Sequence, residues 1–281
     1  MSAKQITEGQ IAAFGKYLYQ VERSAGTIEN YLRHVRSFAT WLGDKPVTKD
    51  ATAEWKAHLV SKEYSPNTIN AMLGGLNRFL AFAGWQKYQV KTLRLQHRLF
   101  RDDSRELTRD EYERLVAAAR AMGRERLALL METICATGIR VSEVQYLTVE
   151  AVKLGKAEIS LKGKIRTILI PGKLRRKLLK YAHKNKTVSG KIFLTRNGKG
   201  LNRKQIWAEM KAVCKAANVP SSKVFPHNLR HLFARTFYKV CRDIAKLADL
   251  LGHSSIETTR IYLISTGAEH AKQLERLNLV M

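Results

Sequence analysis

Cysteine is scarce in this chain of 281 residues, and its positions exclude two kinds of small protein. The three cysteines, Cys135, Cys214 and Cys241, lie far apart among apolar helical patterns and lack the paired spacing of zinc ligands. This usage excludes a disulfide-stapled scaffold and a zinc finger. We therefore expect reduced thiols in the core of a cytosolic protein.

Long apolar runs are absent as well. A membrane-spanning helix needs about 20 consecutive apolar residues, and no segment of the chain approaches that length. Residues 1–8 also lack the apolar region of a secretory signal. We therefore expect neither secretion nor membrane anchoring.

Acidic residues are too few to balance the basic ones. Twenty-four Asp and Glu oppose fifty Lys and Arg, which gives a formal net charge of +26. The excess is spread through both halves of the chain and is not confined to one tail, as a merely solvated charge run would be. Such a charge favours a nucleic acid as the partner, because each phosphate that a cation neutralises releases condensed counterions.

Two segments in the first third of the chain share one helical pattern. Residues 24–43 carry an apolar stripe at helical spacing, with Thr27 as a candidate N-cap, and residues 65–84 repeat the stripe. Helical patterns also cover 11–21 and 51–62. Because two copies are too few for a solenoid, we predict two helical hairpins that pack into a four-helix domain.

After this region the periodicity fades and cations cluster, which is typical of a basic linker. A capping-box pattern from Thr108 to Glu111 then starts a second domain. We predict a helical domain at 1–86, a linker at 87–106 and a second domain at 107–281.

The second domain mixes helical patterns with short strands. Residues 157–161 and 165–170 alternate like strands around Lys162-Gly163-Lys164, which predicts a hairpin, and the apolar residues 192–194 predict a third strand. Helical patterns flank them at 174–184 and 203–217. The predicted fold is therefore mainly α, with a four-helix N-terminal domain and an α+β C-terminal domain that holds a small antiparallel sheet.

The segment 225–262 gathers side chains suited to attack on a phosphodiester. His227 and Arg230 are three residues apart, so they share a helix face. His253 follows a glycine that marks a helix end, and Tyr262 lies shortly after it. Histidine moves protons near neutral pH, the planar fork of arginine matches phosphate oxygens, and tyrosine can form a covalent ester.

Five short motifs follow one another in this domain. Ala-Thr-Gly-Ile-Arg-Val-Ser-Glu-Val ends at Val144, and Leu-Lys-Gly-Lys-Ile-Arg-Thr-Ile-Leu-Ile-Pro covers 161–171. His-x-x-Arg-His covers 227–231, Leu-Gly-His covers 251–253, and a tyrosine follows nine residues later. One such motif is weak evidence, but five in this order are specific. From about Leu107 onward, the chain resembles the tyrosine recombinases, also called the phage-integrase family.

This resemblance implies a role for each motif residue. Arg140 and Arg230 hold the non-bridging phosphate oxygens, and Tyr262 is the nucleophile. His227 accepts the proton of the tyrosine, and His253 donates a hydrogen bond to the phosphate. The resemblance implies no metal and no other cofactor.

The family also places a catalytic lysine on the hairpin, at the residue before the glycine, which is Lys162. It protonates the departing 5′ oxygen as a general acid. Lys164 is two residues further, on the same strand face, and spacing leaves it open as a rival. Two structural alternatives also stay open, namely a salt bridge between Arg140 and Glu143 and a helix-end role for His253.

The implied product is a 3′-phosphotyrosyl link and a free 5′-hydroxyl. Because the link keeps the energy of the phosphodiester, a 5′-hydroxyl of a partner strand can reverse the reaction, and two such exchanges pass through a Holliday junction. The resemblance therefore implies double-stranded DNA as the partner, a homotetramer on two duplexes, and a cytoplasmic location at the nucleoid. It also implies that an amphipathic segment after Gly267 is exchanged between subunits, although a terminal helix packed on its own domain would show the same pattern.

In the family, the helical domain grips DNA opposite the catalytic domain. Helix N-termini and guanidinium groups both suit phosphate, which selects polar residues at helix starts and exposed cations. Ordinary capping and solvation explain any single one of them better. The candidate DNA contacts are Thr27, Arg33, Arg36, Ser65, Asn67, Thr68, Arg78 and Lys164.

Three other functions compete with recombination. His227 and His231 form a His-x-x-x-His pair, but no glutamate follows the first histidine and the nearby Arg230 opposes a zinc ion. A type IB topoisomerase shares the covalent chemistry, and a DNA-binding module without catalysis shares the basic clamp. The compact length disfavours the topoisomerase, and the complete catalytic set disfavours the module. The two-domain layout is Xer-like, and it leaves integration or excision of a mobile element and resolution of chromosome dimers both open.

Overall fold

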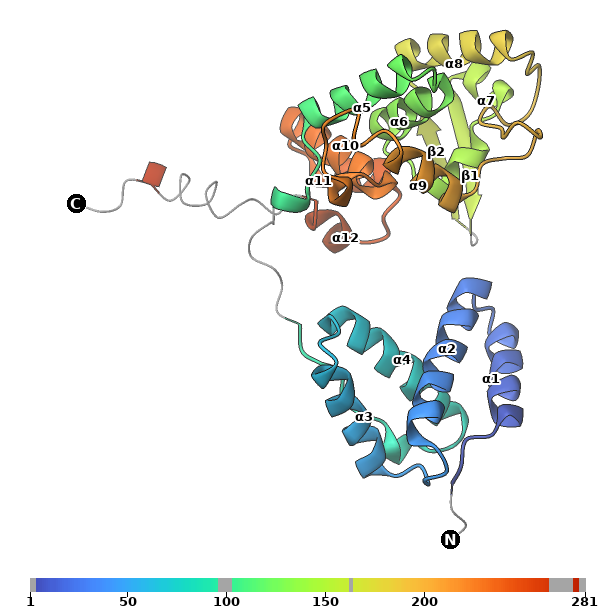
Figure 1. Cartoon of the computed structure of the whole chain (residues 1–281), viewed down its shortest axis with the longest axis vertical. Helices are drawn as coiled ribbons and strands as arrows, with labels where there is room; N and C mark the ends of the chain where they lie inside the picture. The colour runs from blue at the N-terminus through green and yellow to red at the C-terminus, as the bar shows by residue number, and fades with distance from the viewer. Residues whose placement is uncertain (1–3, 96–102, 162–163, 263–274, 278–281) are drawn as a thin grey trace. The chain divides into compact units, whose positions relative to one another are not determined.

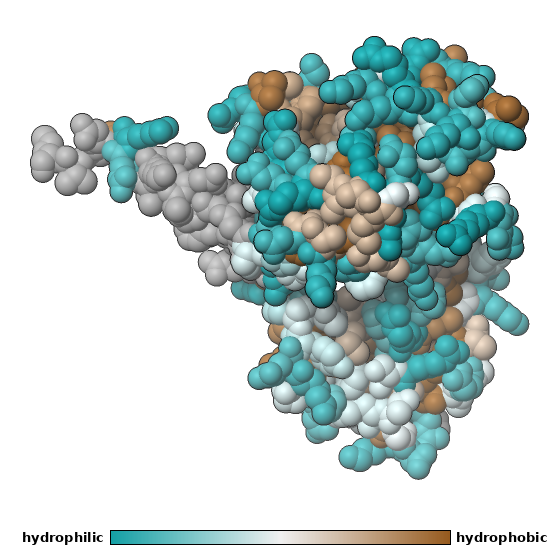
Figure 2. Space-filling view, turned by 45° about the horizontal axis from the view of Figure 1, so that its top comes forward, coloured by the Kyte–Doolittle hydropathy of each residue, from teal (hydrophilic) through white to brown (hydrophobic). Residues whose placement is uncertain are grey.

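A computed structural model of the chain describes residues 4–95, 103–161, 164–262 and 275–277, and divides it into two units, Met1–His97 and Arg98–Met281 (Figure 1). Hydrophilic side chains cover much of the surface visible in Figure 2, as expected for a chain in which 26% of residues are charged. In the described residues, no helix is both long and apolar enough to span a membrane.

The first unit is a bundle of four helices, as predicted. Each helix starts at a Ser or Thr whose side chain accepts a backbone N–H of the first turn. Ser24 and Ser65 cap the two repeated helices, and each also shares a 2.8 Å hydrogen bond with the hydroxyl of the threonine three residues on. The N-cap of the second helix is therefore Ser24, and the prediction of Thr27 was wrong. The elements are α1 (Glu8–Gln20), α2 (Ala25–Leu42), α3 (Lys49–Ser61), α4 (Pro66–Phe82) and the short η1 (Gln86–Tyr88).

Aromatic side chains form much of the core of this unit. Phe14 of α1 and Phe79 of α4 are fully buried, and their rings meet edge to face at 5.4 Å. The chain after α4 stays fastened to that helix, because the side-chain amide of Asn77 exchanges hydrogen bonds of 2.8 and 3.0 Å with the backbone of Val90. The first part of the expected linker, 87–106, therefore packs on the first unit.

The second unit is mainly helical with a two-stranded antiparallel sheet, which confirms the predicted fold class. The strands pair from Lys156 opposite Leu169 to Leu161 opposite Lys164. The third strand predicted at 192–194 was wrong, because the described residues there form only isolated bridges, although Ile192 and Phe193 are buried. The elements are η2 (Asp103–Arg105), α5 (Arg109–Ala121), α6 (Glu125–Thr137), η3 (Val141–Tyr146), α7 (Val149–Leu154), β1 (Lys156–Leu161), β2 (Lys164–Leu169), α8 (Gly172–Lys184), α9 (Arg203–Lys211), η4 (Ser221–Lys223), α10 (Pro226–Cys241), α11 (Ile244–Leu251) and α12 (Ile256–Arg260).

Helix α6 lies in the core of this unit and packs against α5, α8 and α10 (Figure 1). It is apolar on nearly all sides, which is the pattern of a fully buried helix. Gly138 ends it in the left-handed region, with φ at +65°. A Cβ atom at this position would lie 2.4 Å from the ring of Phe233, so only glycine fits where the chain turns towards Arg140.

Candidate active site

Arg230 is the centre of the site and is almost completely buried, with 1% of its surface exposed. It lies on α10, which Pro226 begins and which buries Leu229 and Ala234 in the core. Its Nη1 donates to the carbonyl of Gly138, and its Nη2 donates to the carbonyl of Leu251 at 2.7 Å. These carbonyls lie at the C-terminal ends of α6 and α11, where helix dipoles favour a cation.

Burial lowers the pKa of Arg230, and the charge of Arg140 lowers it further, whereas a hydrogen bond with the Tyr262 side chain raises it. The phenol therefore lies beside the guanidinium. The Nε atom of Arg230 is buried and has no hydrogen-bond partner among the described residues.

Arg140 lies at the N-terminus of η3, immediately before Val141, and is held there by Glu143. The Glu143 carboxylate accepts the backbone N–H of Arg140 at 2.7 Å and its Nη1 at 2.9 Å. The carboxylate is 2% exposed, but the Arg140 side chain is 42% exposed. The salt bridge considered from the sequence is therefore present, and the guanidinium still reaches solvent, where a phosphate can meet it.

Arg166 of β2 is a third guanidinium at this site, and sequence reasoning missed it. Its Nη1 donates to the carbonyl of Leu251 at 2.5 Å and lies 3.5 Å from the Glu143 carboxylate. Burial lowers the pKa of Arg166 to about 10, with Glu143 opposing the shift and the charges of Arg230 and Arg140 adding to it. Its Nε and Nη2 have no partner among the described residues.

The position of Arg166 in the strand could have indicated that its side chain points into the domain. It occurs two residues before Ile168, which is buried, so it lies on the inward face of β2. Gly252 allows the contact with α11, because a Cβ there would lie 2.3 Å from Cδ of Arg166, and its φ of +62° suits glycine.

His253 follows Gly252 and bridges Arg230 to Thr259. Its Nε2 lies 2.9 Å from Nη2 of Arg230, and its Nδ1 lies 2.8 Å from Oγ1 of Thr259. Because a guanidinium only donates, Nε2 of His253 accepts, and the ring proton is on Nδ1. Burial, together with the charges of Arg230 and Arg140, lowers the pKa of His253 to about 4. The ring is therefore neutral at neutral pH.

Tyr262 follows α12 and is 3% exposed. Three histidine rings surround its ring. His253 stacks on it at 5.6 Å between ring centroids, His231 meets it edge-on at 4.4 Å, and His227 lies at 6.0 Å. Apolar side chains of α10 and α11, among them Leu251, pack around it. The structure therefore brings together five of the predicted residues from one chain, namely Arg140, His227, Arg230, His253 and Tyr262.

The hairpin lysines are not part of this described geometry. Lys162 lies outside the described residues. Lys164 is described only through its backbone, which pairs with Leu161 at the end of the hairpin. In the described parts of the chain, no group of three His, Cys, Asp or Glu is arranged to hold a metal ion.

The candidate DNA contacts of the first unit have partners within the protein. Arg36 pairs with Glu8 at 3.2 Å, Arg33 donates to Asn30 at 2.8 Å, and Arg78 donates to the Tyr17 hydroxyl at 2.9 Å. The hydroxyls of Ser65, Thr68 and Thr27 take part in helix capping. A role for them in DNA binding stays a prediction, as it does for the exposed Asn67.

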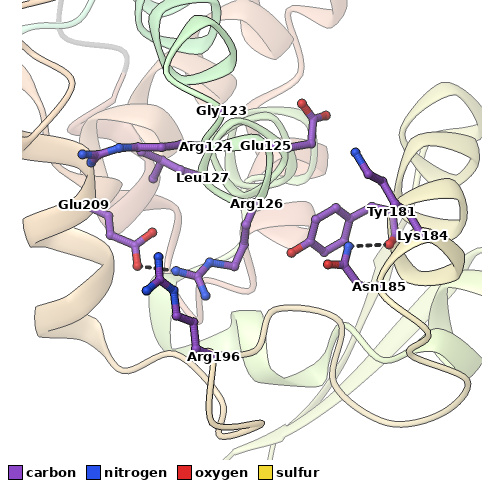
Figure 3. A pocket seen from close by; sticks show the side chains of 10 residues that line it. All are labelled: Gly123, Arg124, Glu125, Arg126, Leu127, Tyr181, Lys184, Asn185, Arg196 and Glu209. Atoms are coloured by element: carbon purple, nitrogen blue, oxygen red, sulfur yellow. Dashed lines mark hydrogen bonds and ion pairs between the residues drawn. The ribbon is translucent and has the colours of Figure 1, made fainter.

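A separate pocket of about 510 Å³ lies at the N-terminal end of α6. Because α6 has 13 residues, the end of the helix that borders this pocket is about 20 Å from the end at Gly138. In Figure 3, the side chains of Arg126 and Arg196 extend toward Glu209, which pairs with Arg126 at 2.6 Å. Most of the residues that line the pocket are charged, and none of them belongs to the site around Tyr262.

Two family models match the chain. One, described as the phage integrase family, matches residues 105–269, and the other, an N-terminal SAM-like domain of phage integrases, matches residues 11–87. The chain belongs to the phage integrase family. Its members, the tyrosine recombinases, are enzymes that break and rejoin DNA, so the resemblance noted in the sequence is confirmed.

Named relatives agree with this membership of the phage integrase family. The chain is 30% identical to tyrosine recombinase XerA of Pyrococcus furiosus over 100% of this chain and 98% of that protein. It is similar in fold to a lambda integrase dimer bound to a core site, with a TM-score of 0.73 and 18% identity over 91% of this chain and 94% of the other. A lambda integrase tetramer bound to a Holliday junction has the same TM-score and 19% identity, over 91% of this chain and 76% of the other.

Proposed function

We propose that this chain is a site-specific DNA recombinase in which Tyr262 cuts a DNA strand and holds its 3′ end until a partner strand replaces it. One observation carries the proposal. The Tyr262 ring is enclosed by three histidines and its hydroxyl lies beside Arg230, with Arg140 and Arg166 around the same Glu143 carboxylate. Cations thus outnumber carboxylates around the tyrosine that acts as the nucleophile.

The cluster suits the charge that develops during cleavage. When the phenol oxygen attacks phosphorus, negative charge accumulates on the non-bridging oxygens. Arg140, which is solvent-exposed, meets these oxygens first, and Arg230 adds its unpartnered Nε. Removing one preorganised donor of this kind usually costs about 2.7–4 kcal/mol of barrier.

The remaining roles concern hydrogen bonds and protons. His253 contacts the phosphate as a donor only after its Nε2 gains a proton, because that atom accepts from Arg230 in the DNA-free chain. Lys162, or its rival Lys164, protonates the leaving 5′ oxygen. A histidine beside Tyr262 accepts the phenol proton, for which the family resemblance selects His227.

Recombination requires more than one subunit. By analogy with the lambda integrase tetramer on a Holliday junction, four copies of this chain hold two duplexes. The segment after Gly267, whose exchange between subunits the family resemblance implies, lies largely outside the described residues. The domain division at 1–86, 87–106 and 107–281 then assigns one DNA-binding unit, a linker and the catalytic unit. Such a protein works at the nucleoid.

Trapping of covalent adducts tests this function. The protein is incubated with genomic or element DNA, denatured, and the DNA attached to protein is sequenced, with Tyr262→Phe as the control. We expect 3′-phosphate adducts at one reproducible site, which disappear in the variant. If the wild type binds DNA and traps nothing, even on nicked duplexes, the chain is a DNA-binding module without catalysis.

A further inference from the structure

Helix α10 carries a second histidine whose ring lies closer to the ring of Tyr262 than that of His227 does. His231 follows His227 by one turn, and its ring centroid is 4.4 Å from that of Tyr262, compared with 6.0 Å for His227. The His231 ring meets the phenol edge-on, at an interplanar angle of 71°. His227 is exposed, whereas His231 is partly buried.

A carboxylate supports His231 from the chain segment that leads into α5. Nδ1 of His231 lies 3.8 Å from Oε1 of Glu106. Glu106 also forms an ion pair with Arg235, one turn further along α10. Since Nδ1 faces the carboxylate, Nε2 is the nitrogen left for another partner. At 3.8 Å the carboxylate forms no hydrogen bond with the neutral ring, but it attracts and orients the imidazolium and compensates the positive charge that the ring gains with a proton.

The Glu106 segment is itself fixed to α10. Nδ2 of Asn228 donates to the carbonyl of Arg105 at 2.7 Å, and Nη2 of Arg235 donates to the carbonyl of Leu107 at 2.7 Å. These bonds fix the backbone immediately before and immediately after Glu106. Glu106 is therefore placed by the backbone of the segment and not only by its own flexible side chain.

The other two histidines are surrounded by cations. Partial removal from water, then the charges of His231, Arg230 and Arg140, lowers the pKa of His227 to about 4. Both nitrogens of His253 are already occupied, by Arg230 and Thr259. A proton on either ring would add charge to a positive cluster, whereas a proton on His231 would face Glu106.

We propose that His231, oriented by Glu106, accepts the proton of Tyr262 when the tyrosine attacks DNA. This rests on the proposed function and assigns the base of the same reaction to His231 in place of His227. The Oη–H bond of Tyr262 breaks and its proton bonds to Nε2 of His231. The electron pair left on Oη forms the bond to phosphorus, the bond from phosphorus to the 5′ oxygen breaks, and that oxygen takes a proton from the lysine general acid.

In this assignment Glu106 is a positioning residue, and His227 is free for another task. Its exposed ring faces solvent, from which a DNA phosphate arrives, and at a pKa of about 4 it is a neutral hydrogen-bond partner. The groups that face His231 include Glu106 from the segment before α5, His227 from α10 and Tyr262 after α12, and Arg235 faces Glu106.

The test is the pH dependence of adduct formation on a nicked duplex that carries the trapped site. Single-turnover rates are measured between about pH 5 and pH 10 for the wild type, His231→Gln, His227→Gln and Glu106→Gln. The wild-type rate falls at low pH because the base takes up a proton, and this fall is the acid limb of the pH profile. In His231→Gln the rate at pH 7 is lower by about 10²–10³-fold and the acid limb disappears. His227→Gln keeps the acid limb, and in Glu106→Gln the limb moves to lower pH because the imidazolium loses a neighbouring carboxylate.

A fluorinated tyrosine at position 262 separates proton transfer from folding. Its phenol ionises more readily, so it restores part of the rate in His231→Gln and leaves the defect of His227→Gln unchanged. If His231→Gln is misfolded by circular dichroism, the shifted limb of the folded Glu106→Gln protein decides. The proposal is overturned if His231→Gln keeps the acid limb, if His227→Gln loses it, or if Glu106→Gln leaves it in place. A wild type that forms no adduct contradicts the proposed function instead.

Discussion

Glu143 carries the only carboxylate found among the three site guanidiniums in the described part of the chain, and Glu143→Gln changes its charge with little change of shape. The carboxylate holds Arg140 through two hydrogen bonds, at 2.7 and 2.9 Å, and lies 3.5 Å from Arg166. A glutamine keeps one acceptor oxygen but turns an N–H₂ group towards one of the guanidiniums. Two cations near Arg230 then lack compensation.

The size of the effect follows from burial. Loss of one partner of a buried ion pair costs about 3–5 kcal/mol. The Arg140 side chain is 42% exposed, so water replaces part of its lost contact, but Arg166 is only 11% exposed. We therefore expect the free energy of unfolding to fall by about 3 kcal/mol, at the low end of that range. Without the carboxylate, Arg140 is displaced by about 1 Å, and we expect this displacement to slow adduct formation by about 10²-fold.

Urea unfolding and single-turnover adduct formation measure the two effects. Glu113→Gln is the matched control, because the Arg109–Glu113 pair on α5 is exposed on both sides, at 77% and 57%. It is expected to change stability by less than about 0.5 kcal/mol and to leave the adduct rate unchanged. A Glu143→Gln protein as stable as this control, with an unchanged adduct rate, would refute the reasoning.

Three other predictions concern the same site. Gly252→Ala places a Cβ 2.3 Å from Arg166 at a φ of +62°, so we expect a lower melting temperature and a slower adduct rate. A variant with the melting temperature of the wild type would contradict the contact. Arg230→Lys keeps a charge but loses the fork between the Gly138 and Leu251 carbonyls, so single-turnover cleavage falls by about 10²–10³-fold while DNA binding measured by anisotropy persists. The pKa of His253 is about 4 in the folded chain and lies below its usual value of about 6.5, so the unfolded chain binds the proton first. The contribution of His253 to stability is therefore full above about pH 6.5 and is lost as the pH falls to about 4. For this partly solvated ring we expect a loss of about 1–2 kcal/mol in the free energy of unfolding. Urea unfolding then shows a smaller loss of stability in acid for His253→Gln than for the wild type.

Much of the fold follows from local signals in the sequence. The helices of the first unit were predictable because apolar residues recur at helical spacing and a Ser or Thr starts each helix. His253 was placed at a helix end because Gly252 stops α11 in the left-handed region. Arg140 and Glu143 were expected on one helix face, and the structure pairs them, although Arg140 lies one residue before η3.

Other features depend on contacts that local patterns do not contain. Arg166 joins the site only because the register of the hairpin turns it inward and α11 docks against it. Glu106 reaches His231 from a distant part of the chain. Ile192 and Phe193 resembled a strand because they are apolar and buried, but burial alone does not supply a neighbouring strand. Helix α9 ends at Lys211, before the predicted end at 217, where backbone bonds shift to shorter spacing.

The role of Tyr262 as nucleophile is the central claim, and mass spectrometry of the trapped adduct tests it most directly. The adduct is digested with protease and nuclease, and the peptide that keeps a nucleotide is sequenced. The account predicts a 3′-phosphate ester on Tyr262, the buried phenol beside Arg230. A nucleotide on any other of the ten tyrosines, or a link through a 5′ phosphate, would contradict it.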